Sequence, residues 1–253
     1  METLQQDPPQ AAPPGEPFDP NAPGAPPRWV NILEYIAIPG FIAAQIYGFV
    51  SSPPDAAMGN LQKIMYVHVP TAWAGMVAFL GVFIGSVLYA WQRRPRYDLV
   101  AAACAEVGVM FTALTLVLGA IWGRPTWGVW WTWDPRLTTT AIMLLLYAGY
   151  LALRAFTDDE ERRARWSAWV GILAFVNVPI VYMSVRWWRT LHQVQSGPST
   201  LEPVYLRALA LNTLAVSLVL IWLVARRYHT SEIERRVEAL REEAALAEGG
   251  SNV

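Results

Sequence analysis

Six apolar segments alternate with short polar segments along the 253-residue chain. A helix that crosses the hydrocarbon core of a bilayer needs roughly 20 predominantly apolar residues, and each segment is long enough. Backbone polar groups inside a bilayer must be hydrogen-bonded within the protein, so segments of this length favour helices over a barrel. We therefore predict an all-α integral membrane protein with six transmembrane helices. The predicted spans are 29–50, 67–91, 99–121, 137–156, 166–186 and 204–227.

Composition agrees with a membrane domain and excludes several classes of protein. Hydrophobic residues make up 54% of the chain, charged residues 15%, and the mean hydropathy is +0.27, which is too apolar for an ordinary soluble domain. A net charge of −1 offers no basic surface for nucleic acid. The single cysteine, Cys104, cannot form an internal disulfide, a CxxC pair or a thiolate cluster, so we expect it to pack as a small apolar side chain.

Basic residues near the ends of the spans predict the orientation, because cytoplasmic loops of membrane proteins are enriched in arginine and lysine. One side has ten basic residues, and the other side has five. The ten are Arg28, Arg93, Arg94, Arg96, Arg154, Arg162, Arg163, Arg165, Arg226 and Arg227. The five are Lys63, Arg124, Arg136, Arg186 and Arg189. Both termini are therefore predicted to be cytoplasmic, with segments 51–66, 122–136 and 187–203 facing outward.

The two ends of the chain fall outside the predicted membrane domain, residues 29–228. Residues 1–28 contain nine prolines and no apolar core, which predicts a disordered cytoplasmic extension. Residues 229–253 predict a cytoplasmic helical tail, with Ser231 and Glu234 as a capping box at its start. The tail is either a solvated helix or a helix that docks a partner.

An unusual concentration of tryptophan lies in the second outward segment, residues 122–136. Five tryptophans fall within twelve residues, more than an aromatic belt at a helix end explains. They are Trp122, Trp127, Trp130, Trp131 and Trp133. We expect a loop here, because Gly123, Pro125 and Gly128 favour irregular backbone. Indole rings at this density suit a large, flat, aromatic ligand. Asp134 precedes Pro135 at the start of the next span, as an N-cap does.

Two of the three histidines flank this tryptophan segment on the outward side. His68 lies at the start of the second span and His192 in the third outward segment, whereas His229 lies at the inner end of the last span. Two imidazoles on one face suit bis-histidine ligation of heme iron. The outward cations, Arg136 among them, are candidates for pairing with heme propionates.

Residues 122–138 read Trp-Gly-Arg-Pro-Thr-Trp-Gly-Val-Trp-Trp-Thr-Trp-Asp-Pro-Arg-Leu-Thr. This segment resembles the WWD signature of the heme-handling proteins of cytochrome c assembly. Together with Tyr-Val-His-Val-Pro around His68, the six spans and the length, it resembles the cytochrome c maturation protein C family (CcmC, heme exporter protein C). The resemblance covers about 29–228 and implies that the five tryptophans, Asp134 and Arg136 bind heme, with His68 and His192 as axial iron ligands.

The resemblance also implies a function in the bacterial cytoplasmic (inner) membrane. Heme b would be held non-covalently at the outer, periplasmic face and handed to a periplasmic heme chaperone (CcmE-like). Further partners would be ABC-type ATPase and membrane subunits (CcmA/CcmB-like) and a small membrane protein (CcmD-like). The chain has neither a GxxxxGK[ST] motif nor CxxCH, so we expect no ATPase and no covalently bound heme, and a transport protein rather than an enzyme.

Three alternatives remain at this point. The first is a heme-attachment subunit of the same superfamily. The second is a multi-span enzyme, although its outward segments offer only scattered carboxylates. The third is a transporter or channel with polar residues between its helices, for which Glu106, Asn177 and Asn212 are candidates. For Glu106, a hydrogen-bonded contact between helices is the simpler expectation.

Overall fold

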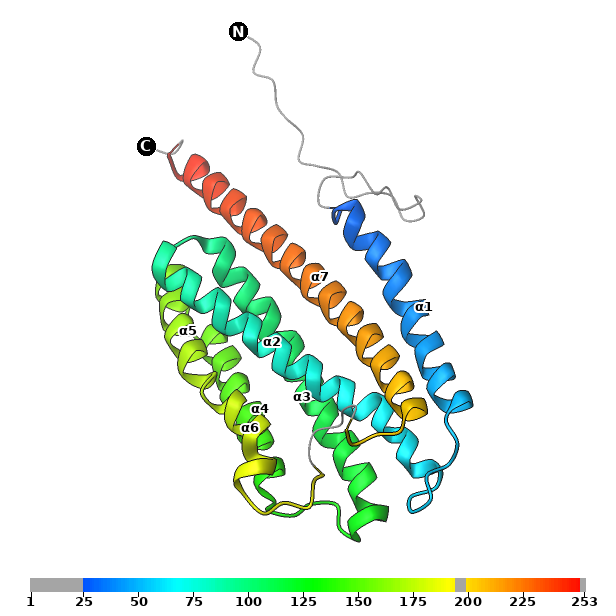
Figure 1. Cartoon of the computed structure of the whole chain (residues 1–253). Helices are drawn as coiled ribbons and strands as arrows, with labels where there is room; N and C mark the ends of the chain where they lie inside the picture. The colour runs from blue at the N-terminus through cyan, green and yellow to red at the C-terminus, as the bar shows by residue number, and fades with distance from the viewer. Residues whose placement is uncertain (1–24, 194–198, 251–253) are drawn as a thin grey trace.

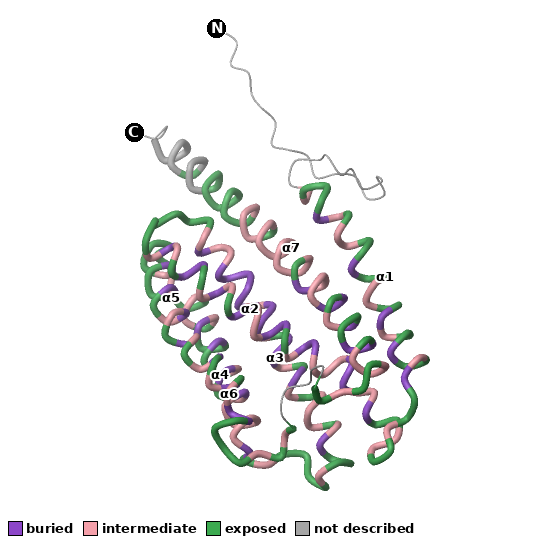
Figure 2. The backbone as a smooth tube through the Cα atoms, in the orientation of Figure 1, coloured by how far each residue is buried: buried purple, intermediate pink, exposed green. Residues whose placement is uncertain are grey.

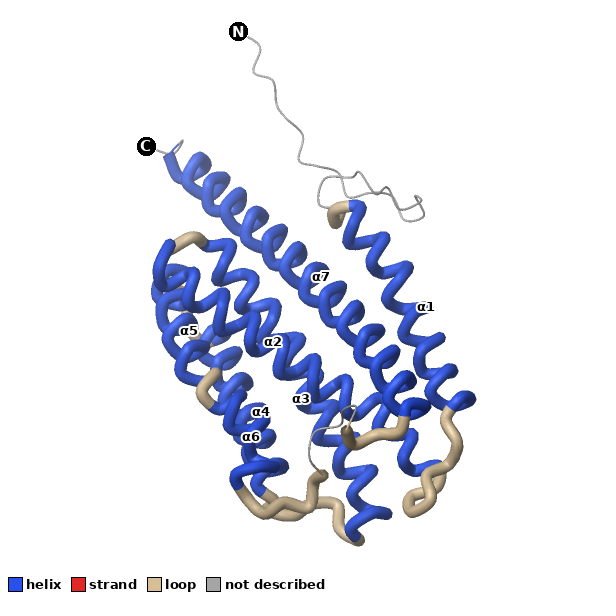
Figure 3. The backbone as a smooth tube through the Cα atoms, in the orientation of Figure 1, coloured by secondary structure: helices blue, strands red, loops and turns tan. Residues whose placement is uncertain are grey.

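The computed structural model describes residues 25–193 and 199–250, and its long elements are all α-helices (Figures 1 and 3). The predicted extension, residues 1–28, lies almost wholly outside the described residues. The helices are α1 (Arg28–Ser51), α2 (Met65–Gln92), α3 (Pro95–Trp127), α4 (Pro135–Ala155), α5 (Glu160–Ala174), α6 (Asn177–Trp187) and α7 (Pro203–Gly250). A short 3₁₀ helix, η1 (Asn60–Ile64), leads into α2.

Six helical stretches in the described part of the chain are long and apolar enough to cross a membrane. They coincide with the six predicted spans, and α5 with α6 forms the fifth. The protein is therefore an all-α, multi-pass membrane protein, as the hydropathy pattern predicts.

The fifth span differs from the single helix that we predicted, because it is interrupted between α5 and α6. Pro179 has no N–H to donate to the carbonyl of Phe175, four residues earlier. That carbonyl instead accepts from the N–H of Val178 at 2.9 Å, which tightens the chain into a turn. The break brings α6 against the outward half of α4, where Asn177 Nδ2 donates to the carbonyl of Thr139 at 2.9 Å.

The tryptophan segment is not a loop throughout, which corrects the prediction for residues 122–136. Helix α3 continues through Pro125 to Trp127 and ends at Gly128, whose left-handed φ of 81° and N–H bond to the Arg124 carbonyl make a C-cap. The irregular loop is therefore only residues 128–134, and Trp122 and Trp127 project from a helix.

The tail also differs from prediction, because α7 continues without a break from the last span to Gly250. Ser231 lies in the middle of this helix, where the backbone N–H groups already have partners four residues earlier, so no capping box forms. The continuous helix carries the tail onward in line with the last span, beside the start of α5 and then past the end of the bundle (Figure 1).

The centre of the bundle is the close pair α2 and α3, with α4, α5 and α6 on one side and α7 and α1 on the other (Figures 1 and 2). Small residues permit this approach, as in many membrane helix pairs. A Cβ at Gly108 would lie 2.6 Å from Phe79 of α2, and one at Gly75 would lie 2.7 Å from the hydroxyl of Thr112. Helix α1 packs chiefly on α7 and leaves most of its apolar surface exposed.

The polar residues inside the spans make separate contacts between helices. Glu106 pairs with Arg227 of α7 at 2.5 Å, which confirms the expected interhelical contact. Asn212 is fully buried between α7 and α1, where it donates to the Ala44 carbonyl and accepts from Gln45 at 2.6 Å. With Asn177 bound to α4, these groups stabilise three different helix pairs rather than line one pathway.

Candidate functional site: a cavity between two histidines

A cavity of about 480 Å³ opens where the tryptophan segment meets the bundle. Its walls come from α2, α3, α4 and α6, with Met58, Trp131 of loop 128–134 and residues 191–193. Along α2 it runs from His68 to Met76, eight residues or about 12 Å by helical rise. This volume lies within the usual range for pockets that hold small molecules and cofactors.

His68 reaches the cavity from the second turn of α2. Its carbonyl accepts from the Thr71 hydroxyl, which in turn accepts from the hydroxyl of Thr115 on α3 at 3.2 Å. The imidazole meets Trp122 edge to face at 5.7 Å between ring centroids, and its Nδ1 is buried without a hydrogen-bond partner. Gly119 makes room for the ring, because a Cβ there would lie 3.1 Å from Cε1 of His68.

His192 reaches the cavity from a different element, the non-helical segment after α6. Its ring packs edge to face on Trp127, with 4.9 Å between centroids. Burial lowers its pKa below the ordinary value, an effect that the Asp134 carboxylate opposes and that Arg136 increases. The imidazole is therefore neutral at neutral pH, the form in which histidine binds a metal.

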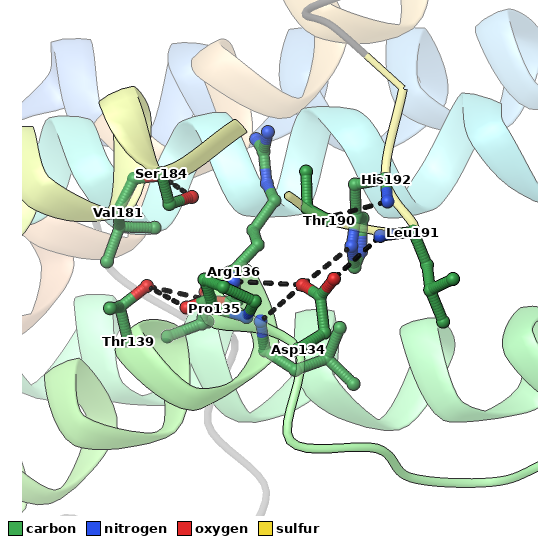
Figure 4. Close-up of polar contacts among 11 residues, drawn as sticks. Asp134, Pro135, Arg136, Thr139, Val181, Ser184, Thr190, Leu191 and His192 are labelled. Atoms are coloured by element: carbon green, nitrogen blue, oxygen red, sulfur yellow. Dashed lines mark hydrogen bonds and ion pairs between the residues drawn. The ribbon is translucent and has the colours of Figure 1, made fainter. Parts of the chain in front are cut away.

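Asp134 contacts the imidazole of His192 but does not line the cavity, and its side chain is only 2% exposed (Figure 4). Its carboxylate caps α4 by accepting from the N–H groups of Arg136 at 2.9 Å and Leu137, as predicted. Burial by itself raises its pKa. Hydrogen bonds from the Thr190 hydroxyl and from the backbone of Leu191 and Arg136 outweigh that effect, so the pKa lies below its ordinary value and the group is ionised.

The five tryptophans divide into two groups. Trp122, Trp127 and Trp131 line the cavity. Trp130 and Trp133 do not line it, and they are 60% and 80% exposed on the surface of the loop. The structure thus places three of the five candidate aromatic side chains with the two histidines.

Arg136 is the predicted outward cation that lines the cavity. Lys63 donates instead to the Phe49 carbonyl at 2.8 Å, and Arg124 donates to the carbonyl of Gly128. His229 lies 26 residues along α7 from Pro203, about 39 Å away by helical rise, and does not contribute to the cavity.

Several lining residues went unpredicted. They include Met76, Thr112, Thr115, Leu116, Gly119 and Met143. Each lies within an apolar span and resembles the core residues around it. Helical spacing is the one sequence signal for them, and it is weak. Met76 follows His68 by eight residues on one face of α2. On α3, Thr112, Thr115 and Gly119 share a face at spacings of three and four residues.

Comparison with known proteins decides the family. The family model described as heme exporter protein C matches residues 24–243. The chain belongs to the heme exporter protein C family. It is 37% identical over 203 residues to heme exporter protein C of Bradyrhizobium diazoefficiens, covering 79% of this chain and 77% of that protein. It is 39% identical over 205 residues to the Haemophilus influenzae protein of the same name, covering 79% and 80%.

A ccmC-like mitochondrial protein of cytochrome c biosynthesis from Marchantia polymorpha is 39% identical over 145 residues, covering 57% of this chain and 61% of that protein. Membership of the heme exporter protein C family confirms the resemblance that the tryptophan segment carries. The family match includes both cavity histidines and most of α7, and most of the proline-rich segment 1–28 precedes it.

Proposed function

We propose that this protein takes part in heme export for cytochrome c biogenesis by holding heme in the cavity at the outer face of the bacterial inner membrane. His68 and His192 would be the axial ligands of the iron. The observation that carries the proposal is that these two histidines, far apart in the sequence, line one cavity from different elements, α2 and the segment after α6. Heme supplies four nitrogen ligands itself, so two imidazoles complete a six-coordinate iron.

The residues present fit this ligand. The cavity wall is mostly apolar and aromatic, as the porphyrin faces require. Buried nitrogen atoms without hydrogen-bond partners, Nδ1 of His68 and Nε1 of Trp122, lie on residues that line the wall. Because an unpaired buried polar group costs free energy, these atoms suit a site that a ligand completes. Arg136 is the cation that would pair with a propionate.

Heme held in this way is b-type, since iron–imidazole bonds and packing retain it without a covalent link. Trp131 lines the cavity and is 39% exposed, so we propose that heme enters and leaves past this side chain. From there we propose that heme passes to a periplasmic chaperone of the CcmE type. The ATPase and membrane subunits (CcmA/CcmB-like) and a small membrane protein (CcmD-like) would act with this chain, which itself transports heme and catalyses no reaction.

Spectra of the purified protein from heme-replete cells test the proposal. We expect a Soret band, a six-coordinate low-spin spectrum, and heme that is released completely by acid–organic extraction. His68→Ala and His192→Ala should each open one coordination position and lower heme retention, and added imidazole should restore the low-spin spectrum. His229→Ala is the matched control, because that residue is remote from the cavity.

The proposal fails if no heme accompanies the wild-type protein. The assignment of the two ligands fails if both alanine variants keep a wild-type low-spin spectrum, or if His229→Ala abolishes it.

A further inference from the structure

Asp134 has a second set of contacts that its role as a helix cap does not require. Its Oδ1 accepts from the N–H of Arg136 at the start of α4. Its Oδ2 accepts from the N–H of Leu191 at 2.7 Å, 57 positions further along the chain. The carboxylate therefore joins the start of α4 to the segment that carries His192 (Figure 4). An aspartate that only capped α4 would leave Oδ2 for water.

The imidazole of His192 lies against the same carboxylate. Its Nδ1 is 3.3 Å from Oδ1 of Asp134, a contact that raises the pKa of the imidazole against the effect of burial. Since the two ring nitrogens lie on opposite sides of an imidazole, Nε2 is directed away from Asp134. Thr190 supports this arrangement, because its hydroxyl accepts from the backbone N–H of His192 at 3.1 Å.

We propose that Asp134 is a positioning residue for His192 rather than a group that touches heme. A carboxylate beside Nδ1 favours the tautomer with the proton on that nitrogen, which leaves the lone pair of Nε2 for iron. The same contact fixes the ring orientation and raises the basicity of the ligand. This inference rests on the proposed heme site and assigns the last residue of the Trp-Trp-x-Trp-Asp sequence a role that acts through His192.

His68 has no carboxylate in that position: the described residues that line the cavity include no Asp or Glu, and its hydrogen-bonding neighbour is the backbone of Thr115. Its Nδ1 is buried without a hydrogen-bond partner, and its neighbours at the cavity are Trp122, Gly119 and Thr115. The two axial positions are therefore unequal: His68 is fixed by a helix and close packing, and His192 is fixed by a carboxylate. Loss of Asp134 should affect one axial ligand selectively, which a general defect in folding would not do.

The test compares Asp134→Asn with Asp159→Asn. Asparagine is as good an N-cap as aspartate, so both variants keep their helix starts. Asp159 caps α5 through the N–H of Arg162 at 2.6 Å and lies away from both histidines, which makes it the matched control. In Asp134→Asn, the amide oxygen still accepts hydrogen bonds, but the carboxylate charge beside the imidazole is gone.

We expect Asp134→Asn to weaken heme binding by about 10- to 100-fold, the usual effect of removing such a partner of a metal ligand. Its heme midpoint potential should rise, because a less basic imidazole stabilises ferric iron less. Excess imidazole should restore the low-spin spectrum. Asp159→Asn should match wild type in all three measurements, and both variants should keep wild-type helicity by circular dichroism.

The outcomes separate this inference from the proposed function. A wild-type protein without six-coordinate heme overturns the proposed function. A six-coordinate wild type with an Asp134→Asn variant of unchanged affinity and potential overturns the positioning role alone. If Asp134→Asn does not accumulate, Asp134→Ser is the second variant, because serine also caps a helix well but places no carboxylate beside His192. A wild-type spectrum and potential in that variant also overturn the inference.

Discussion

The position of each side chain around the cavity depends on whether a helix or a non-helical segment carries it. His68 and Trp122 project from neighbouring helices, so their positions follow from helical geometry and from the small residue Gly119 between them. His192 lies on a segment without helical hydrogen bonds, and its position depends on Asp134 and Trp127. If the two histidines bind iron as proposed, one ligand is held by a helix and the other by side-chain contacts, which suits a protein that holds heme and later releases it.

The division of the tryptophans predicts unequal effects of substitution. Trp127→Ala should weaken heme binding about tenfold or more, because a ring that lines the cavity beside His192 is worth roughly 1.5 kcal/mol. Trp130→Ala should change affinity less than about twofold, since this side chain is exposed and outside the wall. Titration of heme-free protein with hemin measures both. Equal losses in the two variants would show that the whole loop closes on heme.

At the scale of helices, the sequence predicts the spans well and their ends less well. Apolar length is a property of the chain itself, so all six spans are recoverable from it. The end of α3 depends on competition between Pro125, which a helix near its end tolerates, and Gly128, whose left-handed conformation ends it. The helix of the last span continues past Arg227, because the polar residues there continue a helix as readily as they begin a new one.

In the site, too, some residues can be predicted from the sequence and others depend on how the chain folds. Clusters of uncommon residue types predict the histidines and the tryptophans from the sequence, and the cavity is lined by His68, His192 and three of the five tryptophans. The contact between Asp134 and Leu191 joins elements 57 positions apart and has no signature in the chain. Likewise, nothing in the sequence separates Trp130 from Trp131, because their exposure depends on how loop 128–134 folds against the bundle.

One ion pair makes a test at the scale of helices possible. Asp98 of α3 and Arg154 of α4 form a two-bond pair at 2.5 and 2.8 Å, with side chains 9% and 12% exposed. Asp98→Leu leaves a buried arginine unpaired and should lower the free energy of unfolding by about 3–5 kcal/mol. Adding Arg154→Met should recover most of that loss, because two apolar side chains replace two charges.

Denaturant titration in detergent, followed by circular dichroism, measures the free energy of unfolding of the wild type, Asp98→Leu, Arg154→Met and the double variant. The single variants must be compared with the double variant in the same detergent. If the losses simply add in the double variant, the two side chains do not form a stabilising pair, and α3 and α4 are held by apolar packing alone.

The whole molecule has two chemically different ends. At one end lie the cavity, the tryptophan loop and the segment 188–193. At the other lie the start of α1, the turn between α2 and α3 and the start of α5 (Figure 1). The tail of α7 belongs to that second end, because Arg235 pairs with Glu160 at 2.7 Å. The ten basic residues counted from the sequence gather there, so the positive-inside rule predicts that this end is cytoplasmic.

Accessibility in intact cells tests this orientation. In a Cys104→Ala background, we expect an impermeant maleimide to label Thr126→Cys and to leave Glu160→Cys unlabelled. Both positions are exposed, and the 21 residues of α4 separate the two ends by about 30 Å. Permeabilised cells are the control, in which both cysteines should react. Labelling of position 160 but not 126 in intact cells would invert the orientation and place the heme cavity at the cytoplasmic face.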